Sequence, residues 1–196
     1  MPVETDNSGL NIEILATQTT EIPRVSTTTQ NSTEGLALDL TKLTLPTSQV
    51  NFTVYREGTH NNSVGFYKVL DASGAIQTSS GILNPQDAGY VQAAVQAAVS
   101  RTLGAEVNLV ASNQSSITID ATLDKSLYMP IITVNGTLAE AATGKNLGQT
   151  YTSFLGANPD KANHIRLLGD NTFGFEDLVG GGDLDFNDII VKAQVS

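Results

Sequence analysis

Short segments of alternating or β-branched residues recur along most of this chain, and they constrain its fold more than any other feature. Clear examples are QVNFTVYREG at 49–58, SSITIDATL at 115–123 and YMPIITVNGTL at 128–138. A period of two is typical of a strand with one buried face, and turn signals such as Asn135-Gly136 separate these segments. Roughly nine to eleven such strands predict a mainly β fold, an antiparallel β-sandwich that is jelly-roll-like.

Two segments carry more detailed expectations. GLALDLTKLTL at 35–45 predicts a half-buried strand with a bulge or turn near Lys42, where the alternation of leucines changes phase. The stretch that follows the polar residues 59–63 predicts a hairpin, with strands at Phe66–Leu70 and Ala75–Thr78 around a turn at 71–74.

One α-helix is expected. Asn84 has the residue type of an N-cap, and Pro85 suits the first helical position. The body AGYVQAAVQAAVSR at 88–101 follows, and Gly104 is a plausible end. The many alanines would allow this helix to approach a sheet closely.

The first 34 residues differ from the rest. They are rich in Thr, Ser, Asn and Gln, so we divide the chain into an extended N-terminal arm, residues 1–34, and a β domain, residues 35–196. Because Thr and Val suit an extended conformation, we expect the arm to pair along a sheet edge of its own molecule or of a neighbour.

Charge and composition exclude several classes of function. The chain has 20 acidic and 10 basic residues and a net charge of -10, which argues against nucleic-acid binding and disfavours anionic membrane surfaces. It has no long apolar run, so no membrane insertion is expected. It contains no Cys, which excludes disulfides and thiolate metal sites, and no Trp, which weakens a sugar-stacking interpretation.

The densest chemical signal is FEDLVGGGDLDFNDIIVK at 175–192. Calcium takes six to eight oxygen ligands from carboxylates, amides, carbonyls and water. The glycines at 180–182 permit a sharp reversal of the chain, which would bring Glu176 and Asp177 back toward the D-x-D-x-N residues 183–187. The predicted calcium ligands are Glu176, Asp177, Asp183, Asp185, Asn187 and Asp188.

The motif is not an EF-hand. Asp188 stands where that loop requires Gly, and Gln194 stands at the place of the bidentate Glu. Zinc is disfavoured because His60 and His164 lie outside the motif; magnesium is disfavoured because it prefers fewer protein ligands. The alternative interpretation is a solvated acidic turn. If calcium binds, we expect it to fix the loop between two strands, FGFE and IIVK.

NHIRLLGDNTFGFEDLVGGGDLDFNDIIVKAQV at 163–195 resembles the C-terminal signature of a bacterial, mainly cyanobacterial, family, domain of unknown function 4114. SVGFYKVLDASGAI at 63–76 and NPQDAGYVQAA at 84–94 also resemble segments of that family. The resemblance covers roughly residues 50–196 and implies an extracellular calcium-binding β module, found in secreted or surface adhesin-like proteins beside RTX-type repeats. It implies no catalysis.

These observations favour a non-enzymatic role. Adjacent carboxylates in a metal loop are poor candidates for glycoside hydrolysis, and the chain has no G-x-S-x-G motif. We expect a secreted or cell-surface module that self-assembles or mediates adhesion, with calcium stabilising the C-terminal loop. The alternative is a calcium-dependent, lectin-like module that binds a surface glycan, which would need exposed aromatics near the metal. Alternation predicts instead that Phe173, Phe175 and Phe186 are core residues.

Overall fold

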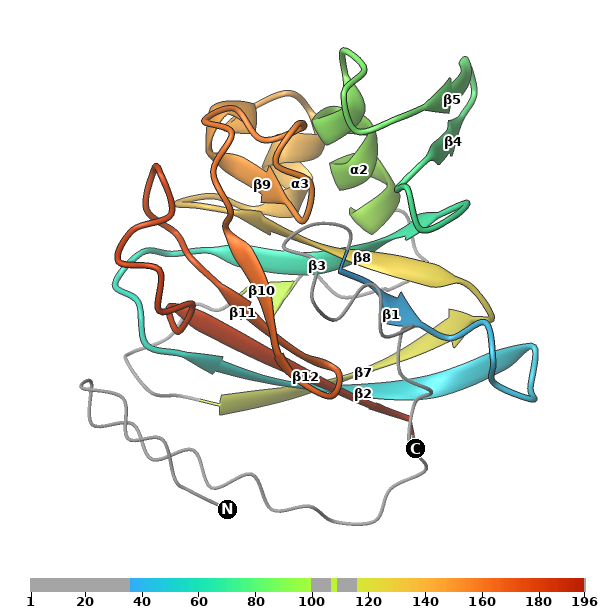
Figure 1. The fold of residues 1–196 in the computed structure, drawn as a ribbon. Helices are drawn as coiled ribbons and strands as arrows, with labels where there is room; N and C mark the ends of the chain where they lie inside the picture. Colours follow the sequence, from blue (N-terminus) through green and yellow to red (C-terminus); the bar gives the residue numbers. More distant parts are fainter. Residues whose placement is uncertain (1–35, 100–106, 109–115, 196) are drawn as a thin grey trace.

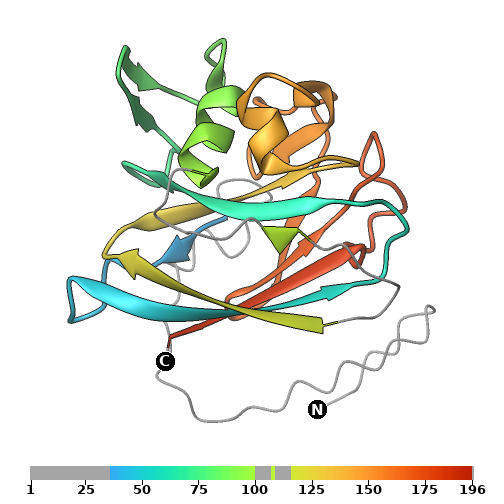
Figure 2. The same ribbon diagram turned by 180° about the vertical axis from the view of Figure 1, so that it is seen from behind.

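The computed structural model describes residues 36–99, 107–108 and 116–195. The predicted arm, residues 1–34, and the predicted end of the helix at Gly104 lie outside these described residues. Within them the chain forms two facing antiparallel sheets with helices on one outer side (Figures 1 and 2). The predicted β-sandwich is therefore confirmed. No helix in the described part of the chain is long and apolar enough to cross a membrane.

Each sheet has five strands, and every pairing is antiparallel. The first has the order β1-β8-β3-β6, with β9 also paired to β8; the second has the order β10-β11-β12-β2-β7. The first sheet contains β1 (Leu38–Asp39), β3 (Ser63–Val69), β6 (Val107–Asn108), β8 (Leu127–Thr133) and β9 (Thr150–Thr152). The second contains β2 (Thr47–Arg56), β7 (Ser116–Asp124), β10 (Ile165–Gly169), β11 (Thr172–Phe175) and β12 (Ile189–Val195).

The main core lies between the two sheets. Strand β2 alternates as its sequence predicts, with Val50, Phe52 and Val54 buried. The ring of Phe66 from β3 lies between the sheets, with centroid distances of 5.2 Å to Phe52 and 5.2 Å to Phe173. Aromatic pairs at this spacing contribute beyond the area they bury, so they join the two layers firmly.

A second core lies on the outer face of the first sheet. It is covered by α2 (Tyr90–Val99), the short α3 (Leu138–Ala142) and the 3-10 turn η1 (Leu147–Gln149) (Figure 1). Both faces of this sheet are thus buried, and β8 is buried at nearly every position instead of alternating. Helix α3, which we did not predict, begins with a capping box in which Thr137 and Glu140 exchange hydrogen bonds.

Two local predictions were wrong. Helix α2 begins at Tyr90 and not at Pro85, because the side chain of Asp87 accepts the backbone N–H of Asn84 and holds these residues in a turn. The predicted hairpin 66–78 does not form: its turn closes, with Gly74 N–H bonded to Asp71 O, but β3 pairs with β8. Strand β4 (Ile76–Thr78) pairs with β5 (Gly81–Leu83) instead.

The predicted strand 35–45 is mostly irregular. Only Leu38–Asp39 pairs, with β8, while Leu36 and Leu40 are buried without belonging to a strand. The turn expected near Lys42 is present, and Asp39 Oδ1 accepts the backbone N–H of Thr41 at 2.9 Å. This segment is held by side-chain burial more than by a backbone ladder.

Candidate metal centre

The acidic loop joins β11 to β12, two neighbouring strands that pair antiparallel from Phe175↔Ile189 onward. It contains residues 176–188 and lies at one end of the sandwich, at the left margin of Figure 1 and the right margin of Figure 2. The two flanking strands were predicted from FGFE and IIVK, and both are confirmed. Their pairing fixes both ends of the loop, so its acidic side chains are confined to a small volume.

Three of the six predicted ligands meet at one point. Glu176, Asp183 and Asp185 each offer a carboxylate oxygen, and these oxygens all lie within 4.8 Å of one another. Glu176 is only 1% exposed, whereas the two aspartates face solvent. We call these three residues the acidic trio. Three carboxylates converging in this way are the ligand chemistry of a hard divalent cation.

The electrostatics of the trio are unfavourable without a cation. Burial raises the pKa of Glu176 to about 7, even though its Oε1 accepts the backbone N–H of Phe186 at 2.6 Å. The negative charges of Asp188, Asp183 and Asp185 contribute to this raised pKa, after burial. A cation in the trio would remove this repulsion and favour the ionised carboxylates.

The turn that brings Asp183 back to Glu176 requires glycine. Gly182 has φ +54, and a Cβ added there would collide with the Oε2 atom of Glu176. Leu184 and Phe186 also have positive φ, of 64° and 59°. Left-handed backbone in non-glycine residues is uncommon, so the surrounding contacts hold this loop in a conformation that the residues alone disfavour.

Asp177 and Asp188 belong to a different set of contacts. Asp177 is buried, and its Oδ2 accepts a hydrogen bond of 2.7 Å from Asn62 Nδ2. Its backbone N–H donates a hydrogen bond of 2.9 Å to Asp188 Oδ2. The backbone oxygen of Asp188 accepts the N–H groups of Glu57 and Gly58. These two aspartates therefore tie the loop to the β2–β3 connection and lie outside the trio.

Charges are also close together in this second set. Burial raises the pKa of Asp188 to about 6, against the hydrogen bond from Asp177 N–H, and the charge of Asp177 raises it as well. His60 Nδ1 lies 3.0 Å from Asp177 Oδ1, but the two atoms do not form a hydrogen bond. His60 and Asp177 are far apart along the chain, so no local pattern predicts that they are neighbours.

Asn187 supports one member of the trio. Its backbone N–H donates a hydrogen bond of 3.1 Å to Asp185 Oδ1, and its side-chain Nδ2 donates one of 2.6 Å to Asp185 Oδ2. The spacing D-x-D-x-N thus orients the second aspartate through the amide of Asn187, which does not itself join the trio.

Two residues outside the predicted ligand set hold the other side of the loop. His164 is fully buried and stacks on Tyr151 of β9, with ring centroids 3.5 Å apart and planes 7° apart. Its Nδ1 lies 3.0 Å from Glu176 O, and its Nε2 lies 2.9 Å from Asp160 Oδ2. Asp160 Oδ2 also accepts the N–H of Gly180. Burial raises the pKa of Asp160, but these bonds and one from Ala162 N–H leave it lowered.

The loop, Asp160 and His164 lie in the part of the chain that resembles a known family, whereas Asn62 and the β2–β3 connection lie outside it. Residues 125–196 match the family model of DUF4114, a domain of unknown function. The match includes the trio, Asp160 and His164, and it leaves β2, β3 and α2 outside. Neither the curated proteins nor the solved structures gave a match to this chain.

The aromatic residues that we predicted as core in the matched segment are internal. Phe173, Phe175 and Phe186 are all fully buried, and the guanidinium of Arg166 lies 4.1 Å from the ring centroid of Phe186. These rings are therefore not available to stack on a sugar at the loop. The large side chains that the loop does expose are aliphatic: Leu178, Val179 and Leu184.

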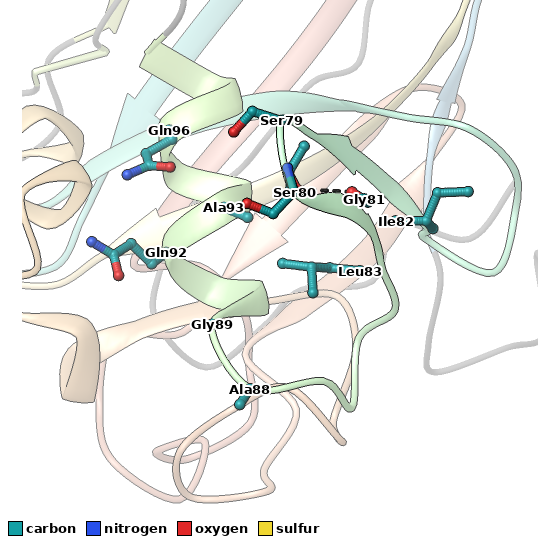
Figure 3. Close-up of a pocket in the computed structure, with 11 residues that line it drawn as sticks. Ser79, Ser80, Gly81, Ile82, Leu83, Ala88, Gly89, Gln92, Ala93 and Gln96 are labelled. Carbon is teal, nitrogen blue, oxygen red and sulfur yellow. Dashed lines mark hydrogen bonds between the residues drawn. The ribbon is translucent and has the colours of Figure 1, made fainter.

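A surface groove lies elsewhere on the molecule. It has a volume of about 410 Å³ and runs between α2 and the β4–β5 hairpin, on the opposite side of the view from the acidic loop (Figures 1 and 3). Its walls are uncharged, with Ser79 and Ser80 on the hairpin and Gln92 and Gln96 on the helix. Since no carboxylate lines it, this groove is not a second cation site.

Proposed function

We propose that the acidic trio binds calcium, and that this chain is a non-enzymatic, calcium-stabilised β module of a secreted or cell-surface protein that serves in assembly or adhesion. The observation that carries the proposal is the convergence of three carboxylate oxygens within 4.8 Å, one of them on the buried Glu176. A buried carboxylate facing two others is costly unless a cation or a proton neutralises it.

The chemistry of the ligands favours calcium over other metals. All three side chains of the trio offer oxygen, whereas zinc prefers nitrogen and sulfur. Asp183 and Asp185 are exposed, which leaves room for water or further oxygens to complete six to eight ligands. Magnesium demands stricter octahedral geometry and usually keeps several waters.

The role we assign to the ion is structural. The trio closes a loop between β11 and β12, and the contacts of Asn62 and His164 fasten that loop to the rest of the sandwich. A ligand that binds only the folded state raises the free energy of unfolding. Assembly through strand addition by residues 1–34 remains part of this proposal.

Calorimetric calcium titration, paired with thermal melts in calcium and in chelator, tests the proposal. The wild type should bind calcium saturably and melt at higher temperature with it. Asp183→Ala with Asp185→Ala should lose both effects. Asp120→Ala, which removes an exposed carboxylate bonded to Asn51, should keep both. Absence of binding in the wild type, or full binding in the double variant, would overturn the proposal.

A further inference from the structure

We infer that Leu178, Val179 and Leu184 form an apolar tip that docks, with calcium bound beside it, into the surface of an anionic phospholipid bilayer. The inference rests on the proposed calcium site and adds a partner to it.

The apolar tip is unusual for a loop. The three side chains are 50%, 71% and 52% exposed, and all belong to one stretch of seven residues. About half of the Leu178 and Leu184 side chains and most of Val179 therefore face solvent, on a loop that is otherwise acidic and glycine-rich. Contiguous exposed apolar groups commonly mark an interaction site.

The tip and the trio are parts of the same turn. Leu178 Cβ lies 3.4 Å from the position of a Cβ at Gly182, and Leu184 Cδ2 lies 2.9 Å from that at Gly181. Leu184 also stands between Asp183 and Asp185 in the sequence. Anything that contacts the tip therefore also meets the carboxylates of the trio.

The charge of the loop then decides whether it can bind a bilayer. Without calcium, the trio and the net charge of -10 repel anionic lipid. With calcium, the three carboxylates of the trio fill only part of the six to eight oxygen positions of the ion. Lipid phosphate oxygens are suitable ligands for the remaining positions, so the ion bridges two anionic surfaces while the aliphatic side chains enter the hydrocarbon boundary.

The small size of the tip favours a lipid surface over a protein. A stable protein interface buries about 800 Å² on each partner, which three partly exposed side chains do not supply. The loop lies at the outer edge of the molecule in both views (Figures 1 and 2). A small exposed apolar group at the edge of the molecule needs no complementary pocket when the partner is a deformable bilayer.

Vesicle co-sedimentation of the full chain tests the inference. The vesicles are phosphatidylcholine alone or mixed with phosphatidylserine, each in calcium and in chelator. We expect sedimentation only with phosphatidylserine and calcium together. Leu178→Ser with Leu184→Ser should weaken it by on the order of tenfold for each side chain, because the buried apolar area is lost.

Controls separate this inference from the calcium proposal. Ile82→Ser, a matched change of an aliphatic residue 56% exposed on β5, should sediment like the wild type. Both serine variants should keep calorimetric calcium binding. Three outcomes would overturn lipid docking while leaving the calcium site intact. The protein could bind calcium without sedimenting, or the leucine variant could sediment like the wild type. The protein could also self-associate in calcium without vesicles, and lose that self-association when the leucines are replaced.

Discussion

Replacing Glu176 by glutamine is expected to change stability in opposite directions with and without calcium. In chelator at pH 7.5 the substitution removes a buried charge that faces Asp183, Asp185 and Asp188. Glutamine retains an oxygen that can accept the N–H of Phe186, so the fold of the loop should persist. The calcium-free variant should therefore be more stable than the wild type.

The magnitude follows from the raised pKa. A change from 4.5 to about 7 in the folded state corresponds to about 3 kcal/mol at neutral pH, and screening by solvent at the open side of the trio reduces it to about 1–2 kcal/mol. For a chain of this size, that gain raises the melting temperature by about 2–8 °C.

The pH dependence has a definite sign. A carboxyl whose pKa is raised by folding contributes stability below about 4.5, and this contribution is lost as pH rises through about 7. The calcium-free wild type should lose stability over this window, and Glu176→Gln should lose less. At pH 4.5 and below the two proteins should melt together, because glutamate is then protonated like its neutral replacement.

Thermal melts at pH 4.5 and pH 7.5, each in chelator and in calcium, provide the assay. In calcium at pH 7.5 the order should reverse, since the variant lacks one carboxylate of the trio. Asp120→Asn, which neutralises an exposed carboxylate of β7, serves as the control and should show neither effect. A variant that melts below the wild type in chelator at pH 7.5, or gains equally at both pH values, would refute the electrostatic reasoning.

Three further substitutions test the support of the loop. Gly182→Ala should destabilise the protein by about 1–3 kcal/mol and weaken calcium binding, because its Cβ collides with Glu176 Oε2 at a left-handed φ; denaturant melts and calorimetry measure both. Asn62→Ala should cost about 1–3 kcal/mol in urea unfolding, because it leaves the buried Asp177 Oδ2 without this donor. His164→Phe preserves a ring but loses two hydrogen bonds, and we expect a loss of about 2–4 kcal/mol by the same assay.

Predictions from local sequence patterns were correct where the structure depends on residues close together in the chain. The alternation of Val50, Phe52 and Val54 reports a strand with one buried face, and that strand is present. The D-x-D spacing brings Asp183 and Asp185 together because two residues in a tight turn cannot separate far. The glycines beside them were also recognisable, since few other residues adopt their backbone angles.

Tertiary structure alone decided which segments face each other. Nothing near β3 in the sequence indicates that its partner is β8, or that helices cover the outer face of that sheet. The hairpin prediction failed for this reason: a turn at 71–74 is local, whereas strand pairing is set by which apolar faces pack together.

The candidate site divides in the same way. The sequence by itself determined an acidic, glycine-rich loop between two strands, and it supported a prediction of six calcium ligands, of which three converge in the structure. Only the tertiary structure separated Asp177 and Asp188 from the trio, because these two residues bond to Asn62 and the β2–β3 connection. Only the tertiary structure brought His164 and Asp160 into contact with the loop. Spacing along the chain decides which side chains are close because they are neighbours in sequence. The packing of distant segments decides which of these side chains are buried, which are hydrogen-bonded and which face another charge.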